Sequence, residues 1–214
     1  MNYEAGRERQ PEAMPGETTK PTRKPGGWSA VRQHLTTWDP AALLALVKDL
    51  YEAGAANRDF IQARCQADES GGEVLEKYRG KIVEQFFPTR GFGKLKLGEA
   101  RKAIRDYRKA TGNLPGTAEL LMTYVENGTS FTREYGDIDE RFYRSMESAL
   151  EELAVLLRGE ARELYPAFSG RLASVEQMSD SIGWGFDEFV ADVVGRLEED
   201  LGGPEASPAS SPST

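Results

Sequence analysis

The chain has 214 residues, of which 39% are hydrophobic and 29% charged, and its formal net charge is -8. This is the composition of a globular protein, and no apolar run approaches the ~20 residues that span a bilayer. A single cysteine, Cys65, excludes an internal disulfide and a cluster of thiolate metal ligands. The N-terminus lacks the apolar segment of a secretory signal, which predicts a cytoplasmic location.

The two ends of the chain predict disordered tails. Residues 1–27 are rich in Pro and Gly, and residues 202–214 are small and polar. Such segments bury too little apolar surface to offset the entropy of ordering. We therefore expect one folded domain over residues 28–201.

The folded part predicts helices throughout. Asp39 is a candidate N-cap before Pro40 and an apolar stripe that Gly54 ends. Ser70 and Glu73 have the spacing of a capping box, and Pro88 ends the helix that follows.

Further along the chain, the basic helix starts at Gly98, and Thr117 is the expected cap of the next helix. Asp137 and Glu140 form a second capping box, and two amphipathic segments then carry Leu164–Val175 and Phe186–Leu197. The expected fold is all-α, an irregular bundle or short array of seven to eight helices.

Gly54 and Gly128 each follow a Glu-x pair, which predicts that the two segments share a helix–Gly–helix turn. Cys65 is expected to be buried.

The strongest functional feature is a basic segment within an acidic chain. Residues 74–112 carry a net charge of +7, whereas residues 113–201 carry -12. At 100° per residue, the cations of the helix lie opposite an apolar stripe of Ala100, Ala103, Ile104 and Tyr107. The candidate anion-binding residues are Arg90, Lys94, Lys96, Arg101, Lys102, Arg105, Arg108 and Lys109.

Three interpretations of this basic surface stay open. It can be a solvated face opposite acidic helices of the same chain or of a second copy. It can bind a nucleic-acid backbone, which the acidic charge of the whole chain disfavours. It can recognise an acidic protein or a small phosphorylated ligand. The solvated face is the favoured interpretation of the surface itself. As a function we expect a non-catalytic binding or regulatory module that recognises an acidic partner or a phosphate-bearing ligand, with no cofactor and no membrane partner.

Conventional catalytic chemistry has little basis in the sequence. His34 is the sole histidine, and GFGKLKLG lacks the Gly-Lys-Ser/Thr ending of a P-loop. The alternative is a metal-dependent enzyme, with Glu134, Asp137 and Asp139 as ligands. Helix capping explains the same carboxylates and is the favoured interpretation. A candidate pocket consists of Tyr124, Glu126, Thr132, Tyr135, Asp137 and Trp184.

Trp184 stands between Gly183 and Gly185, so it can present a flat recognition surface or pack inward. Packing is the favoured interpretation, because Ile182 and Phe186 are apolar neighbours.

Several segments, in order, resemble an uncharacterised bacterial domain family of unknown function. They are FFPTRG, KLKLGEARKAI, YVENG, FTREYGDID, FYRSMESAL and SIGWGF. The resemblance covers nearly all of residues 28–200. It implies an independent all-helical domain and supplies no catalytic residues.

Overall fold

The computed structural model describes residues 27–66 and 72–202, and every regular element in these ranges is helical. The predicted all-α fold is confirmed. The elements are α1 (Trp28–Leu35), α2 (Pro40–Ala53), α3 (Ala55–Gln66), α4 (Glu73–Phe86), α5 (Leu97–Thr111), α6 (Leu114–Tyr135), α7 (Glu140–Arg158), the 3-10 helix η1 (Arg162–Leu164), α8 (Tyr165–Ser179) and α9 (Phe186–Leu201).

The described residues contain nine α-helices, more than the seven or eight expected. The short α1 and the weakly patterned α3 account for the difference. None of the described helices is long and apolar enough to cross a membrane.

The chain divides into two compact units, one up to Asp49 and one from Leu50 onward. The first unit holds α1 and most of α2, and neither helix has a buried residue. The start of α2 is as expected: Pro40 is its first residue, and the amide of Ala42 donates to Oδ1 of Asp39 at 2.8 Å. The prediction of a single domain over 28–201 stays a prediction.

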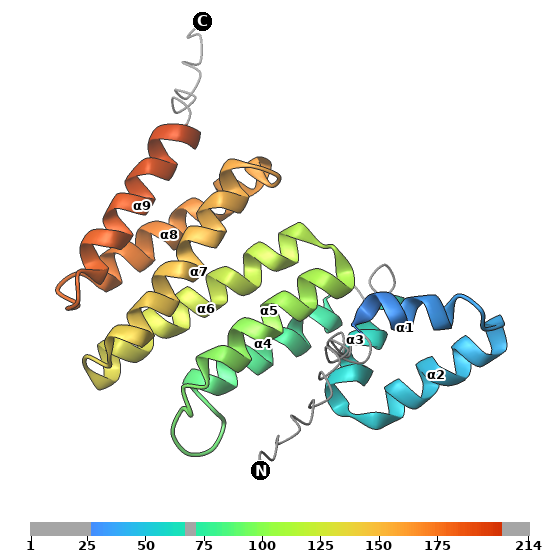
Figure 1. Ribbon diagram of the computed structural model, residues 1–214. Helices are drawn as coiled ribbons and strands as arrows, with labels where there is room; N and C mark the ends of the chain where they lie inside the picture. Colours follow the sequence, from blue (N-terminus) through green and yellow to red (C-terminus); the bar gives the residue numbers. More distant parts are fainter. Residues whose placement is uncertain (1–26, 67–71, 203–214) are drawn as a thin grey trace, which may run out of the picture. The chain divides into compact units, whose positions relative to one another are not determined.

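In the second unit, α6 lies among α4, α5, α7 and α8 (Figure 1). α9 packs on α7 and α8, and α3 packs on α5. Aromatic rings tie α4, α6 and α7 together: the Phe86 ring lies 5.3 Å from that of Tyr124 and 6.5 Å from that of Phe142, centroid to centroid. All three side chains are almost fully buried, so they form the centre of the core.

Two predictions for the α6 segment are wrong. The helix begins at Leu114, because the side chain of Asn113 accepts a hydrogen bond from the amide of Gly116 at 2.7 Å. Thr117 is therefore not the cap, and its hydroxyl donates to the Asn113 carbonyl. Gly128 is not a turn but a buried position inside α6, where a Cβ atom would lie 2.2 Å from the Met146 side chain. Close packing of α7, not chain reversal, explains this glycine.

Cys65 is exposed in α3, which contradicts the prediction that it is buried. Its neighbour Ala63 takes the buried position instead. Ser70, the expected cap of α4, lies outside the described residues. The apolar stripe of α5 is confirmed, since Ala100, Ala103, Ile104 and Tyr107 are all buried.

Gly116 provides a test of how tightly α5 and α6 pack. A Cβ atom at this position would lie 2.1 Å from the hydroxyl oxygen of Tyr107, whose ring is buried. We expect Gly116→Ala to lower the free energy of unfolding by about 1–3 kcal/mol through overpacking. Gly170 of α8 is the matched control, because nothing lies within 4 Å of its added Cβ atom. Gly170→Ala should raise stability by about 0.5–1 kcal/mol. Denaturant titration measures both, and equal effects would contradict this packing.

Candidate functional site

The basic surface of α5 is divided between two environments, and two of its arginines, Arg101 and Arg108, face acidic residues of α7 and of the turn that follows α7. Nη2 of Arg101 lies 2.7 Å from a carboxylate oxygen of Glu152, and the Arg101 side chain is only 14% exposed. Its guanidinium also lies over the Tyr124 ring, 5.7 Å from the centroid. Arg101 is thus part of the α5–α6–α7 packing, not a freely solvated residue of a binding face.

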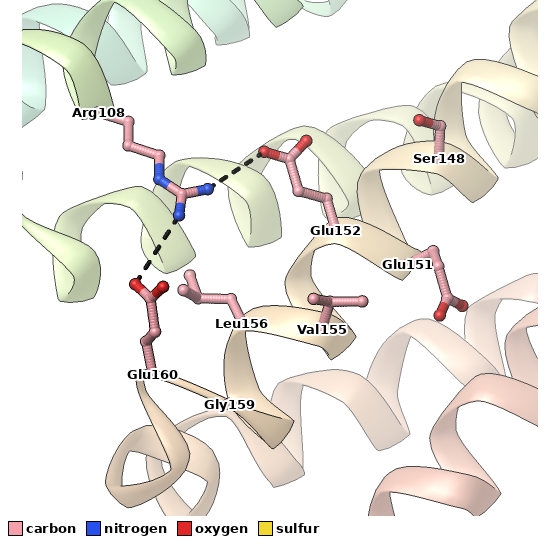
Figure 2. Close-up of a pocket in the computed structure, with 8 residues that line it drawn as sticks. All are labelled: Arg108, Ser148, Glu151, Glu152, Val155, Leu156, Gly159 and Glu160. Carbon is pink, nitrogen blue, oxygen red and sulfur yellow. Dashed lines mark ion pairs between the residues drawn. The ribbon is translucent and has the colours of Figure 1, made fainter.

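Arg108 is held more loosely and lines a pocket of about 510 Å³ (Figure 2). Its guanidinium reaches from α5 toward Glu152 and Glu160, and each N–O distance is 4.0 Å. Val155 and Leu156 supply apolar lining beside these charges. This part of the basic surface is therefore partly neutralised within the chain, as the first of the three interpretations expected.

The N-terminal part of the basic surface lies at a second pocket, of about 450 Å³. Residues at the start of α5 line one side of it, and residues at the start of α7 line the other. The lining residues are Leu95, Lys96, Leu97, Gly98, Glu99, Ile138, Asp139, Arg141 and Phe142. We call this the α5/α7 N-terminal pocket.

The loop between α4 and α5 determines where this pocket forms. The amide of Leu95 donates to the Gln85 carbonyl at 2.9 Å, which folds the loop back on the end of α4. A Cβ atom at Gly93 would lie 2.2 Å from the carbonyl oxygen of Phe86, so only glycine fits there. Gly93 therefore allows the loop to fold back against α4. Lys94 and Lys96 follow it, just before the start of α5.

Both helices begin with backbone amides that lack acceptors. In the described part of the chain, no hydrogen bond is made by the amide of Gly98 in α5 or by that of Arg141 in α7. Helix N-termini carry about half a positive charge each and stabilise anions. Gly98 and Arg141 both line the pocket, so two helix N-termini lie at its edge.

The charged side chains of this pocket balance formally. Lys96 and Arg141 are cationic, and Glu99 and Asp139 are anionic. Lys96 Nζ lies 2.9 Å from a Glu99 oxygen, and Asp139 accepts from the Phe142 amide at 2.7 Å as the N-cap of α7. Both carboxylates are therefore already engaged with neighbours.

The other predicted cations do not converge on one point. Lys102 pairs with Asp106 in its own helix, and Lys109 lies over the Phe60 ring. Arg90, Lys94 and Arg105 are exposed, and the described residues offer them no ion-pair partner. The structure gathers only Lys96 of the eight cations into the α5/α7 N-terminal pocket.

The acidic residues predicted around Asp137 also separate. Glu126 and Arg171 form two hydrogen bonds of 2.7 Å each, and Glu119 accepts from the same guanidinium at 2.6 Å. The hydrogen bond to Glu126 raises the pKa of Arg171, against the opposing effect of burial. Glu126 is thus part of a clamp between α6 and α8. Within residues 27–66 and 72–202, no group of three or more His, Cys, Asp or Glu is arranged to hold a metal ion.

The predicted capping box at Asp137 and Glu140 is wrong, because the cap of α7 is Asp139. Asp137 instead accepts a hydrogen bond from the phenol of Tyr143 at 2.9 Å. The Thr132 hydroxyl lies 2.6 Å from this phenol oxygen of Tyr143. Burial raises the pKa of Tyr143, and the hydrogen bond to Asp137 adds to this effect. The phenol therefore stays protonated and donates at neutral pH.

The remaining residues of the predicted pocket do not meet either. Tyr124 is buried and lies 2.7 Å from the Ser145 hydroxyl, whereas Tyr135 is half exposed. None of the six lines either pocket described above. The prediction that Trp184 packs inward is wrong: its side chain is 59% exposed, on a left-handed residue with φ +64°. The turn points Trp184 outward while Ile182 and Phe186 are buried.

Arg141, Ile138 and the Gly98 amide were missed by the sequence analysis. The sequence places Arg141 among acidic residues, far from the basic segment, and only the packing of α7 beside the start of α5 brings it there. No protein-family model matches the chain, and neither do the curated proteins or solved structures compared with it. The resemblance to an uncharacterised bacterial family stays a prediction.

Arg101 and Arg105 form a matched pair for testing which part of α5 is structural. We expect Arg101→Ala to lower the free energy of unfolding by roughly 1–3 kcal/mol, because it leaves Glu152 without its close partner. Arg105→Ala should stay within about 0.5 kcal/mol, since Arg105 is exposed. Urea unfolding measures both variants, and equal stability of the two would contradict a structural role for Arg101.

Asp137 can be tested as an acceptor for Tyr143. Asp137→Ala should cost about 1–2 kcal/mol of stability in the natural chain and much less in a Tyr143→Phe background, where no phenol needs an acceptor. Asp139→Ala is the control: it should cost about 0.5–2 kcal/mol in both backgrounds, as expected for a helix cap. A loss at Asp137 that is independent of Tyr143 would show that the hydrogen bond is not its role.

Proposed function

We propose that this chain is a non-catalytic binding module that recognises a small phosphorylated ligand at the α5/α7 N-terminal pocket. The observation that carries the proposal is the meeting of two helix N-termini with Lys96 and Arg141 at one hollow. Free backbone amides at a helix start are ready donors for phosphate oxygens, and the helix dipole favours the negative charge.

The chemistry of the lining supports a phosphate monoester. Lys96 and Arg141 supply charge-assisted donors from opposite sides, and an arginine can bind a phosphate with two parallel hydrogen bonds. Leu95, Leu97 and Ile138 supply apolar surface for the organic part of the ligand. The volume of about 450 Å³ lies within the range of small-molecule sites.

The alternatives that the sequence left open have less support. Nucleic-acid binding needs a continuous row of solvated cations, whereas Arg101 is engaged with Glu152 and Arg108 lies near Glu152 and Glu160. A metal-dependent enzyme needs convergent ligands, whereas Asp137 accepts a hydrogen bond from Tyr143 and Asp139 caps α7. The two carboxylates of the proposed pocket are both engaged, which favours binding over acid–base catalysis.

Titration with inorganic phosphate and simple sugar phosphates, followed by calorimetry or phosphorus NMR, tests the proposal. The double variant Lys96→Gln/Arg141→Gln should weaken binding at least about tenfold, because each residue removes a charge-assisted hydrogen bond. Glu99→Gln should strengthen binding, since it releases Lys96 from its ion pair. Binding should also weaken as salt is added.

Lys102→Gln is the matched control. Lys102 is exposed in the same helix and pairs with Asp106, yet it does not line the pocket. It should leave the affinity nearly unchanged. Absence of phosphate binding, or an equal loss in Lys102→Gln, would overturn the proposal. A steep salt dependence with single-stranded DNA and none of these site effects would indicate a nucleic-acid binder instead.

A further inference from the structure

The N-terminal unit carries apolar helices with nothing buried, although their composition is that of a packed element. Ten of the 14 residues of α2 are apolar, yet neither α1 nor α2 has a buried residue. A helix that is apolar around most of its circumference is normally covered. Large apolar side chains are instead exposed by 36% to 70% of their surface: Trp28, Val31, Trp38, Leu43, Leu44 and Val47.

The exposed side chains recur at helical spacing. Leu43 and Val47 follow the i, i+4 pattern of one face of α2, and Trp28 and Val31 share a face of α1. This is the pattern of a helix that packs against another helix, yet none of these side chains is buried. We call these residues the α1/α2 apolar surface.

Its area is close to what a stable dimer needs. Aromatic side chains offer about 150–250 Å² each; with somewhat less for Leu and Val, the exposed fractions correspond to roughly 600 Å² of apolar surface. The largest such patch on a typical monomer is about 300–600 Å². Each partner of a standard protein interface contributes about 800 Å². The polar rim of the interface would supply the area that the apolar surface does not.

Charge indicates which partner fits. Between residues 27 and 49 the chain has two cations, Arg32 and Lys48, and two acids, Asp39 and Asp49, so this region is formally neutral in a chain of charge -8. Two copies can meet here without the like-charge repulsion that the rest of the chain would cause. A membrane-surface helix would carry an excess of Lys and Arg, which these residues lack.

We infer that the chain forms a homodimer in which the α1/α2 apolar surfaces of two copies pack against each other. The same surface on both copies makes a closed two-fold interface, so association stops at the dimer. The described part of the α5/α7 N-terminal pocket is made from other helices, so the inference is independent of the proposed ligand.

Sedimentation equilibrium of the full chain over a wide concentration range tests the dimer. The natural chain should reach twice its mass of 23.7 kDa. Leu43→Lys/Val47→Lys should raise the dissociation constant at least about tenfold, because an ammonium group would be buried without a partner. Both positions are already exposed in one copy, so circular dichroism should show unchanged helix content. Val155→Lys is the matched control, since Val155 is a 59% exposed apolar residue on α7, and it should still dimerise.

Tryptophan fluorescence provides a second measurement. The chain has three tryptophans, so Trp184→Phe leaves only Trp28 and Trp38, both on the inferred interface. Their emission should shift to shorter wavelength as concentration rises, and the shift should be lost in the Lys double variant. A monomer at every concentration overturns the inference. So does a dimer that Val155→Lys disrupts as strongly, or a monomer that cosediments with phosphatidylcholine vesicles.

Discussion

Burial of α6 on nearly all sides is the constraint on which the second unit depends. Thirteen residues of this 22-residue helix are buried, including threonines and glycines that would be poor choices for a solvated helix. Each buried hydroxyl needs a partner: Thr129 donates to the Val125 carbonyl, and Thr132 meets Tyr143. The glycines allow close approach, with Gly116 against Tyr107 and Gly128 against Met146. The positions of α5 and α7 follow from these contacts, and so does the pocket between their N-termini.

Ion pairs between helices of the second unit stabilise this packing. Arg171 holds Glu126 and Glu119 of α6, and Arg101 of α5 holds Glu152 of α7. Partly buried ion pairs are costly to break because the remaining charge is left desolvated. The acidic and basic halves of the sequence are thus not two separate interaction surfaces. They meet within the second unit, and the proposed ligand site uses the part of the basic segment that this network leaves aside.

Sequence rules that use only neighbouring residues located the helices better than they assigned roles to individual residues. Asp39 before Pro40 marked the start of α2, and the apolar spacing of α5 identified its buried face. The same rules misplaced the caps of α6 and α7, because Asn113 and Asp139 stood near other plausible caps. They also read Gly128 as a turn, since a glycine needed for helix packing has no local signature distinct from one that ends a helix. Arg141 was missed because its place at the pocket depends on a neighbour more than forty residues away in sequence, Lys96.

The sequence by itself determined the helical class, the amphipathic face of most helices and the unequal distribution of charge. These properties depend on residues one to four positions apart, where backbone geometry alone fixes which side chains share a face. Only the tertiary structure decided which cations are engaged, which carboxylates are caps or clamps, and where two helix N-termini meet. It also placed the Trp184 side chain outward, although its apolar neighbours in sequence, Ile182 and Phe186, are buried. Such outcomes depend on contacts between distant segments, and these contacts decide whether a given charge is solvated, paired or placed at a pocket.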